Sequence, residues 1–172
     1  CKCDLVTSMV VEFPALQGIV GRQYAREKRE KFTVADAIFE HYLPRFAGDI
    51  LPSTDVGLIL SIADKIDTIT GMFIAGKIPS GSADPFALRR KASGIVLSIL
   101  KGKYDFELAD LISCDLKLYL ESYNLKGTNS SKITGEVRDF IIARLKFLLE
   151  KKGKRLDILD SILRSGCGSI LD

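Results

Sequence analysis

The sequence has little that suggests a membrane or a metal: it contains no tryptophan, one histidine, four cysteines and no long hydrophobic run. No apolar stretch approaches the roughly 20 residues that a transmembrane helix needs, so the sequence predicts no membrane segment. The cysteines are scattered, and Cys1-x-Cys3 lacks the two-residue spacing of a zinc knuckle, so we expect reduced thiols. A net charge of +3, from 25 basic and 22 acidic side chains, is too small to indicate nucleic-acid binding by itself.

Catalytic motifs are also missing from the sequence. There is no phosphate-binding loop, no Gly-x-Ser-x-Gly, and no cysteine–histidine pair with an orienting group. His41 is the only histidine, and a single histidine at a helix end is more often an exposed or packed side chain than a catalyst. We therefore predict no catalytic residue, no metal and no cofactor in this chain.

The composition is that of an ordinary globular protein, with 47% hydrophobic and 27% charged residues in a chain of 172. Apolar residues recur at helical steps, strict alternation never persists, and there is no hairpin signal or internal repeat. The sequence therefore predicts an all-α fold. Because it starts at Cys1, without a methionine or a leader pattern, we expect it to be a piece of a longer protein.

The segment from Leu58 to Arg90 carries the central prediction. Apolar residues three or four positions apart form one stripe of a helix: Leu58, Ile62, Ile66, Ile69 and Phe73. Further apolar residues on the far side leave only a narrow sector around Lys65 for water, so we expect this helix to be central. Asp64 and Asp67 then face the interior, where an ionised carboxylate must be paired, hydrogen-bonded or bound to a metal.

The next helix offers a partner for these carboxylates. Asp84 followed by Pro85 is a helix-start signal, so a helix is expected from Pro85. On this helix Arg89 projects among apolar neighbours and is expected to be the counter-ion. It acts either in a buried bridge that fixes how two helices pack or as a direct ligand-binding group. Arg90 points nearer the edge of the helix, and its role stays open.

The densest basic run lies on an earlier expected helix. Arg22, Arg26 and Arg29 follow one another there at steps of four and three on one face. Two interpretations stay open, because Glu27 and Glu30 remove much of the local charge. The run is either a solvated helix face or a stripe that contacts phosphates.

Four blocks of the sequence carry a resemblance to a known family. In chain order they are DLVTSMVVEFPALQGIVGRQYA at 4–25, EHYLPRFAGDILP at 40–52, ADKIDT at 63–68 and GSADPFALRR at 81–90. Together they resemble the β subunit of the bacterial-type tetrameric glycyl-tRNA synthetase. The match is close over the N-terminal part of the chain and looser beyond it, through EVRDFIIARLKFLLEKKG at 136–153.

This resemblance implies a domain organisation. Residues 1–103 are expected to form a helical core like that of the HD superfamily of metal-dependent phosphohydrolases, and residues 104–172 a C-terminal helical extension. Asp4 and Asp64 stand where two acids of the HD signature belong, but a lysine and a cysteine precede Asp4 and the histidines of the signature are missing. Two carboxylates cannot supply the ligands of a divalent metal, so phosphohydrolase activity is not expected.

The resemblance also implies a function. Activation of glycine with ATP and Mg belongs to a separate α subunit, in a cytoplasmic enzyme, while the β subunit binds tRNA(Gly) and this helical domain faces the acceptor arm. A helical surface can meet an RNA duplex through phosphates, 2'-hydroxyls and shape. The candidate contacts are Arg22, Arg26, Arg29, Lys65, Lys77, Arg90 and Lys91. The alternative is a scaffold that only holds the other β-subunit domains in place, with Asp64, Asp67 and Arg89 as a polar core.

Overall fold

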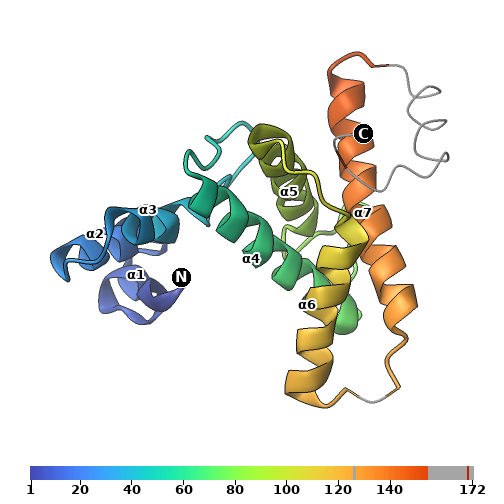
Figure 1. Cartoon of the computed structure of the whole chain (residues 1–172), viewed down its shortest axis with the longest axis horizontal. Helices are drawn as coiled ribbons and strands as arrows, with labels where there is room; N and C mark the ends of the chain where they lie inside the picture. The colour runs from blue at the N-terminus through green and yellow to red at the C-terminus, as the bar shows by residue number, and fades with distance from the viewer. Residues whose placement is uncertain (126, 155–169, 171–172) are drawn as a thin grey trace. The chain divides into compact units, whose positions relative to one another are not determined.

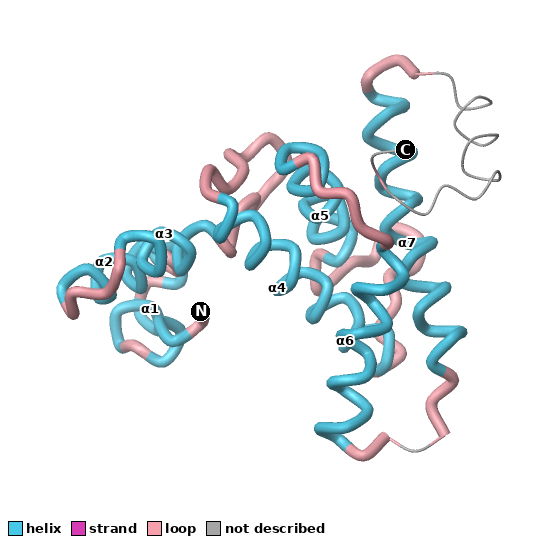
Figure 2. The backbone as a smooth tube through the Cα atoms, in the orientation of Figure 1, coloured by secondary structure: helices cyan, strands magenta, loops and turns pink. Residues whose placement is uncertain are grey.

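The structure, a computed structural model, describes residues 1–125, 127–154 and 170. In that part of the chain the regular elements are α-helices and 3-10 turns, and the only β pairing is one isolated bridge between Ser80 and Ala83 (Figure 2). The all-α prediction is confirmed. None of the helices described is long and apolar enough to cross a membrane.

Two compact units make up the chain, residues 1–64 and residues 65–172. The division falls within helix α4 (Asp55–Ile74), which contributes its first half to one unit and its second half to the other. The boundary near residue 103 that the resemblance implies stays a prediction, because it concerns the extent of an HD-like core and not the division into compact units.

The first unit begins with η1 (Cys3–Val6), α1 (Ser8–Glu12), η2 (Pro14–Leu16), α2 (Ile19–Glu27) and α3 (Phe32–Glu40). Helices α2 and α3 pack against each other, and η1 packs against α2 (Figure 1). A Cβ added at Gly21 of α2 would lie 2.7 Å from Ile38 and 3.0 Å from Asp4. This close approach requires glycine at the site, although glycine lowers helix stability.

A buried carboxylate from α3 holds the start of α4. Glu40 is 5% exposed and accepts hydrogen bonds from the backbone N–H and hydroxyl of Ser53, at 2.7 and 2.5 Å, and from those of Thr54, at 3.2 and 2.5 Å. Burial raises the pKa of Glu40, but these hydrogen bonds outweigh it and the pKa is lowered. A Cβ added at Gly57 would overlap the Glu40 side chain, so α4 also needs glycine in its first turn.

The second unit contains α5 (Leu88–Gly102), α6 (Leu108–Tyr123) and α7 (Ser130–Lys151). Helix α7 packs against both α5 and α6, and Figure 1 shows α6 and α7 side by side. The ring of Phe73 on α4 meets that of Phe140 on α7 edge-on, with centroids 5.3 Å apart. The core is built from fully buried aliphatic side chains: Leu88, Ile95, Ile99, Leu108, Ile112, Leu116, Val137 and Ile141.

Helix α5 begins at Leu88, after Ala87 at the N-cap position, and not at Pro85, so the predicted start is wrong, although the Asp84 side chain still bonds to the first turn. The Asp84 carboxylate accepts hydrogen bonds from the backbone N–H groups of Leu88, at 2.8 Å, and Arg89, at 3.0 Å. A turn separates cap and helix, because Ala87 has a left-handed φ of +53° and its N–H bonds back to the Asp84 carbonyl at 3.0 Å.

The outward face of α4 also differs from the prediction. The apolar stripe from Leu58 to Phe73 is buried, as predicted. Lys65, however, is only 3% exposed, whereas Asp67 is exposed. Lys65 falls about two turns after Leu58 and so lies at the edge of the buried stripe. Asp67 lies one turn after the exposed Ala63, in the sector that meets solvent.

Candidate nucleic-acid interface

Two of the predicted arginines lie together on α2, where they meet Asp36 of α3. Nη1 of Arg22 is 3.9 Å and Nη2 of Arg26 is 2.8 Å from Oδ1 of Asp36. The side chains of Arg22 and Asp36 are each 32% exposed, and that of Arg26 is 40% exposed. Ion pairs with this exposure add little stability, but the shared carboxylate places both guanidinium groups on one side of the α2–α3 pair.

Aromatic rings from α3 lie beside these guanidinium groups. Cζ of Arg22 lies 4.2 Å from the centroid of Phe39, and Cζ of Arg26 lies 5.9 Å from that of Phe32. Phe32, Asp36 and Phe39 are spaced four and three residues apart, so they share one face of α3. Arg22 and Arg26 are likewise four residues apart and share one face of α2. These matching intervals are the signal in the sequence that could have revealed the pairing of α2 with α3.

Arg45, which the sequence did not single out, belongs to the same surface. From the loop after α3, its Cζ lies 6.0 Å from the Phe39 centroid and 5.8 Å from that of Phe46. Its Nε donates to Asp49 at 2.9 Å, and the hydrogen bond from the guanidinium lowers the pKa of Asp49 to about 2. We call the following six residues the arginine–aromatic surface: Arg22, Arg26, Phe32, Phe39, Arg45 and Phe46.

This surface offers two kinds of contact to RNA. A guanidinium has five N–H donors in a planar fork, so one that is paired with a single carboxylate keeps donors for phosphate oxygens. Phe32 is 75% exposed and Phe46 is 55% exposed, and such rings can stack on unpaired bases. Asp36 and Asp49 lower the local net charge of this surface.

The other predicted contacts lie elsewhere. Arg29 follows the end of α2 with a left-handed φ of +62°, so it does not continue the helical stripe of Arg22 and Arg26. Lys77 and Arg90 are exposed and Lys91 is half-buried, all in the second unit. The burial of Lys65 removes it from the surface. The predicted set is therefore divided between the two units.

The structure tests only part of the predicted polar core of Asp64, Asp67 and Arg89. Asp64 forms an ion pair with Lys2, at 2.5 Å, and its side chain is 9% exposed. The expected interior position of Asp67 is wrong, because that residue is exposed, and none of the ion pairs described joins it to the half-buried Arg89. A bridge between Arg89 and Asp64 would join the two units and stays a prediction.

The carboxylates of Asp4 and Asp64, at the two positions that resemble the HD signature, interact with other groups of the protein. Asp4 is 1% exposed, and its carboxylate accepts hydrogen bonds from the backbone N–H of Gly18, at 2.6 Å, and from the hydroxyl of Tyr42, at 3.0 Å. Asp64 has the Lys2 ammonium beside it. Burial, and then the hydrogen bond to Asp4, raises the pKa of Tyr42, which keeps this hydroxyl a donor. The residues described contain no group of three or more metal-ligating acids, histidines or cysteines.

Comparison with known proteins identifies the same family that the four sequence blocks resemble. The model of a family described as glycyl-tRNA synthetase beta subunit matches residues 1–164. The chain is 47% identical to the glycine–tRNA ligase beta subunit of Desulforamulus reducens over 171 residues, which cover 99% of this chain and 24% of that protein. It is 48% identical to the corresponding subunit of Buchnera aphidicola from Schizaphis graminum, over 94% of the chain and 23% of the relative. The chain thus spans about a quarter of the length of the curated relatives that it matches.

Proposed function

Because the chain belongs to the glycyl-tRNA synthetase β-subunit family, we propose that it is a tRNA-binding helical part of a glycine–tRNA ligase, which contacts the acceptor arm of tRNA(Gly) and supports formation of glycyl-tRNA. In this proposal, a separate α subunit activates glycine with ATP and Mg, and the complete enzyme acts in the cytoplasm. In this proposal the present chain contributes binding and no catalytic group.

The arginine–aromatic surface is the observation that supports tRNA contact. Its arginines are held by Asp36, Asp49 and phenylalanine rings, so less conformational entropy is lost when they meet phosphates than if they moved freely. Most contacts between proteins and nucleic acid go to phosphate and sugar, and arginine is the side chain best suited to them.

The test uses the complete ligase with Arg22→Gln and Arg26→Gln combined. Glutamine removes both cations without adding a charge beside Asp36. At limiting tRNA, aminoacylation should fall by about tenfold, since two phosphate contacts are lost. ATP–pyrophosphate exchange, which needs glycine and ATP but no tRNA, should stay within about twofold.

Asp36→Asn is the matched control. It removes the carboxylate that faces both arginines and keeps the arginines themselves, so tRNA affinity should stay the same or rise. If the arginine variant lowers both activities equally, the surface serves subunit assembly. If it lowers neither, tRNA contact by this surface is wrong.

A second candidate function is that of a scaffold within the longer β subunit. The first unit exposes apolar side chains near its start: Val6 at 86%, Val11 at 70% and Phe13 at 53%. Exposed apolar side chains that gather on one surface are typical of sites of protein contact. Phe13→Ser should weaken assembly of the ligase under the scaffold proposal and leave it intact otherwise, as gel filtration of the complete enzyme can show.

A further inference from the structure

A strongly basic stretch begins in the second half of α7 and continues just past its end. Between residues 144 and 154 the chain has five basic side chains and one acidic one, Glu150. Arg144, Phe147 and Lys151 follow one another at steps of three and four, so they share one face of α7. We call these three residues the α7 basic face. It belongs to the second unit, whereas the arginine–aromatic surface belongs to the first.

Both cations of the α7 basic face lie near the ring between them. Cζ of Arg144 is 5.2 Å and Nζ of Lys151 is 4.7 Å from the centroid of Phe147. Phe147 is 38% exposed, and Lys151 is exposed as well. A cation within about 6 Å of a ring centroid is attracted to the ring. The ring therefore favours positions in which both charges stay close to it at the surface.

These two cations have no carboxylate partner in the described part of the chain. None of the ion pairs found there includes Arg144 or Lys151. Nε of Arg144 is buried and has no hydrogen-bond partner among the described residues, so the stem of this side chain packs against the protein. The arginines of α2, by contrast, share the carboxylate of Asp36. An anion that meets the α7 basic face therefore displaces no acid.

The helix dipole explains only part of this arrangement. Cations near the end of a helix are stabilised by the negative end of its dipole, which accounts for Lys151 and the following Lys152. That effect falls off within the last turn, and Arg144 lies about two turns before the end of α7. The position of Arg144 beside Phe147 needs another explanation.

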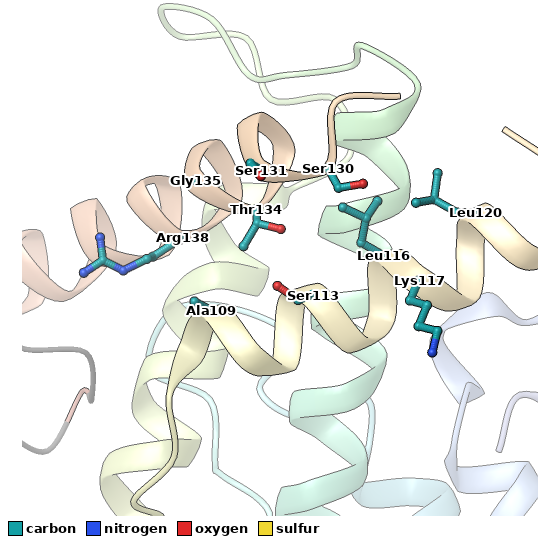
Figure 3. A pocket seen from close by; sticks show the side chains of 10 residues that line it. All are labelled: Ala109, Ser113, Leu116, Lys117, Leu120, Ser130, Ser131, Thr134, Gly135 and Arg138. Atoms are coloured by element: carbon teal, nitrogen blue, oxygen red, sulfur yellow. The ribbon is translucent and has the colours of Figure 1, made fainter. Parts of the chain in front are cut away.

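Cations elsewhere on α6 and α7 are arranged differently. Lys117 and Arg138 border a trough of about 540 Å³ between the two helices, and Figure 3 shows their charged ends pointing away from it. Each is paired with an acid of its own helix, Lys117 with Glu121 at 3.9 Å and Arg138 with Asp139 at 3.5 Å. The trough therefore offers little positive charge to an anion.

We propose that the α7 basic face is a second RNA contact, which binds phosphate groups of the sugar–phosphate backbone through Arg144 and Lys151. A guanidinium can bind two oxygens of one phosphate, and an ammonium group binds a phosphate as a point charge. Neutralisation of phosphates dominates the affinity of proteins for nucleic acid, and a stretch so rich in basic side chains suits a polyanion. This inference rests on the proposed tRNA-binding function and adds a contact in the second unit.

The experiment measures binding of a tRNA(Gly) transcript to the complete ligase at several salt concentrations. Arg144→Gln and Lys151→Gln combined should weaken binding about tenfold at low salt and reduce the slope of log affinity against log salt by about 2, because two phosphate contacts are lost. Lys151→Gln alone changes only an exposed side chain and leaves the buried part of Arg144 in place. It should reduce the slope by about 1.

Lys117→Gln and Lys132→Gln combined is the matched control. It removes the same charge from the second unit, but each of these lysines is paired with a glutamate of its own helix, at 3.9 Å for Lys117 and 3.8 Å for Lys132. The slope should fall by less than half as much as in the variant that lacks Arg144 and Lys151.

The outcomes separate this face from the arginine–aromatic surface. If both α7 variants bind tRNA like the parent while the Arg22 and Arg26 variant binds weakly, the α7 inference is wrong and the proposed function stands. If the control lowers the slope as much as the double α7 variant does, binding follows total charge and the inference is overturned. If the α7 variants instead dissociate the ligase, as gel filtration would show, the face binds protein and the inference is also overturned. If no variant at either surface weakens binding, both are wrong.

Discussion

Asp4 stands where a metal-binding acid occurs in the HD signature, but here its oxygens accept hydrogen bonds from Gly18 and Tyr42. These bonds tie η1 to the start of α2 and to the end of α3. Asp4→Asn keeps the shape but turns an N–H₂ group toward one of the two donors, which leaves a buried donor without an acceptor. We expect a loss of about 2 kcal/mol in the free energy of unfolding, measured by urea titration.

A matched surface change gives the baseline for that measurement. Asp139 has a side chain that is 76% exposed, so Asp139→Asn should change the free energy of unfolding by less than about 0.5 kcal/mol. Equal midpoints for the Asp4 and Asp139 variants would show that the Asp4 hydrogen bonds do not hold the first unit together.

The Arg45–Asp49 pair allows a prediction about pH. The guanidinium hydrogen bond lowers the pKa of Asp49 in the folded chain to about 2, below the value of about 3.9 in an unfolded chain. A lowered pKa means that the pair stabilises the fold above pH of about 4 and that this contribution is lost as the pH falls toward 2. A carboxyl NMR titration should place the Asp49 midpoint near 2, and Arg45→Gln should move it upward. An unchanged midpoint in that variant would contradict the role given to Arg45.

Within the helices, two glycines should respond in opposite ways to the same substitution. Gly57→Ala forces a Cβ into the Glu40 side chain, so it should destabilise the protein by about 1 to 3 kcal/mol. Gly135→Ala meets no atom and gains helix propensity, so it should stabilise by about 0.5 to 1 kcal/mol. Thermal unfolding of the two variants checks the signs. A loss of stability at both positions would mean that α7 is packed more tightly at Gly135 than described.

The elements were more predictable from the sequence than the faces they present. The sequence of α4 places apolar residues on more than one side of the helix, so the pattern alone does not show which side meets solvent. In the structure Ile59 is 57% exposed, whereas Lys65 is buried. Asp84 was predicted near the helix start, where its carboxylate does bond to the first N–H groups of α5, but the turn through Ala87 has no signal of its own, because a left-handed φ at alanine is uncommon.

The candidate site was only partly predictable for a related reason. Arg22 and Arg26 were visible as neighbours on one helix, whereas Asp36, Phe32 and Phe39 join them only because α2 and α3 pair. Arg45 lies in a loop, where no periodicity points to it. The α7 basic face follows one helical repeat in the sequence, but whether an acid pairs with its cations depends on how α7 packs against α5 and α6.

For the molecule as a whole, the dependence of tRNA binding on salt measures how many cations take part. The three arginines of the arginine–aromatic surface should account for a slope of log affinity against log salt of about −3, if each meets one phosphate. Replacing Arg22, Arg26 and Arg45 with glutamine in the complete ligase should therefore reduce the slope by about 3. The same slope with a lower affinity would mean that the arginines act through folding and not through phosphates.

Glu40 binds the start of α4 from 13 positions earlier in the chain. A ribosome releases residues in order, so α3 leaves the exit tunnel before Ser53 and Thr54 do. Closing so short a loop costs little chain entropy. The carboxylate is therefore already outside the tunnel when Ser53 and Thr54 emerge, just ahead of the first residue of α4, Asp55.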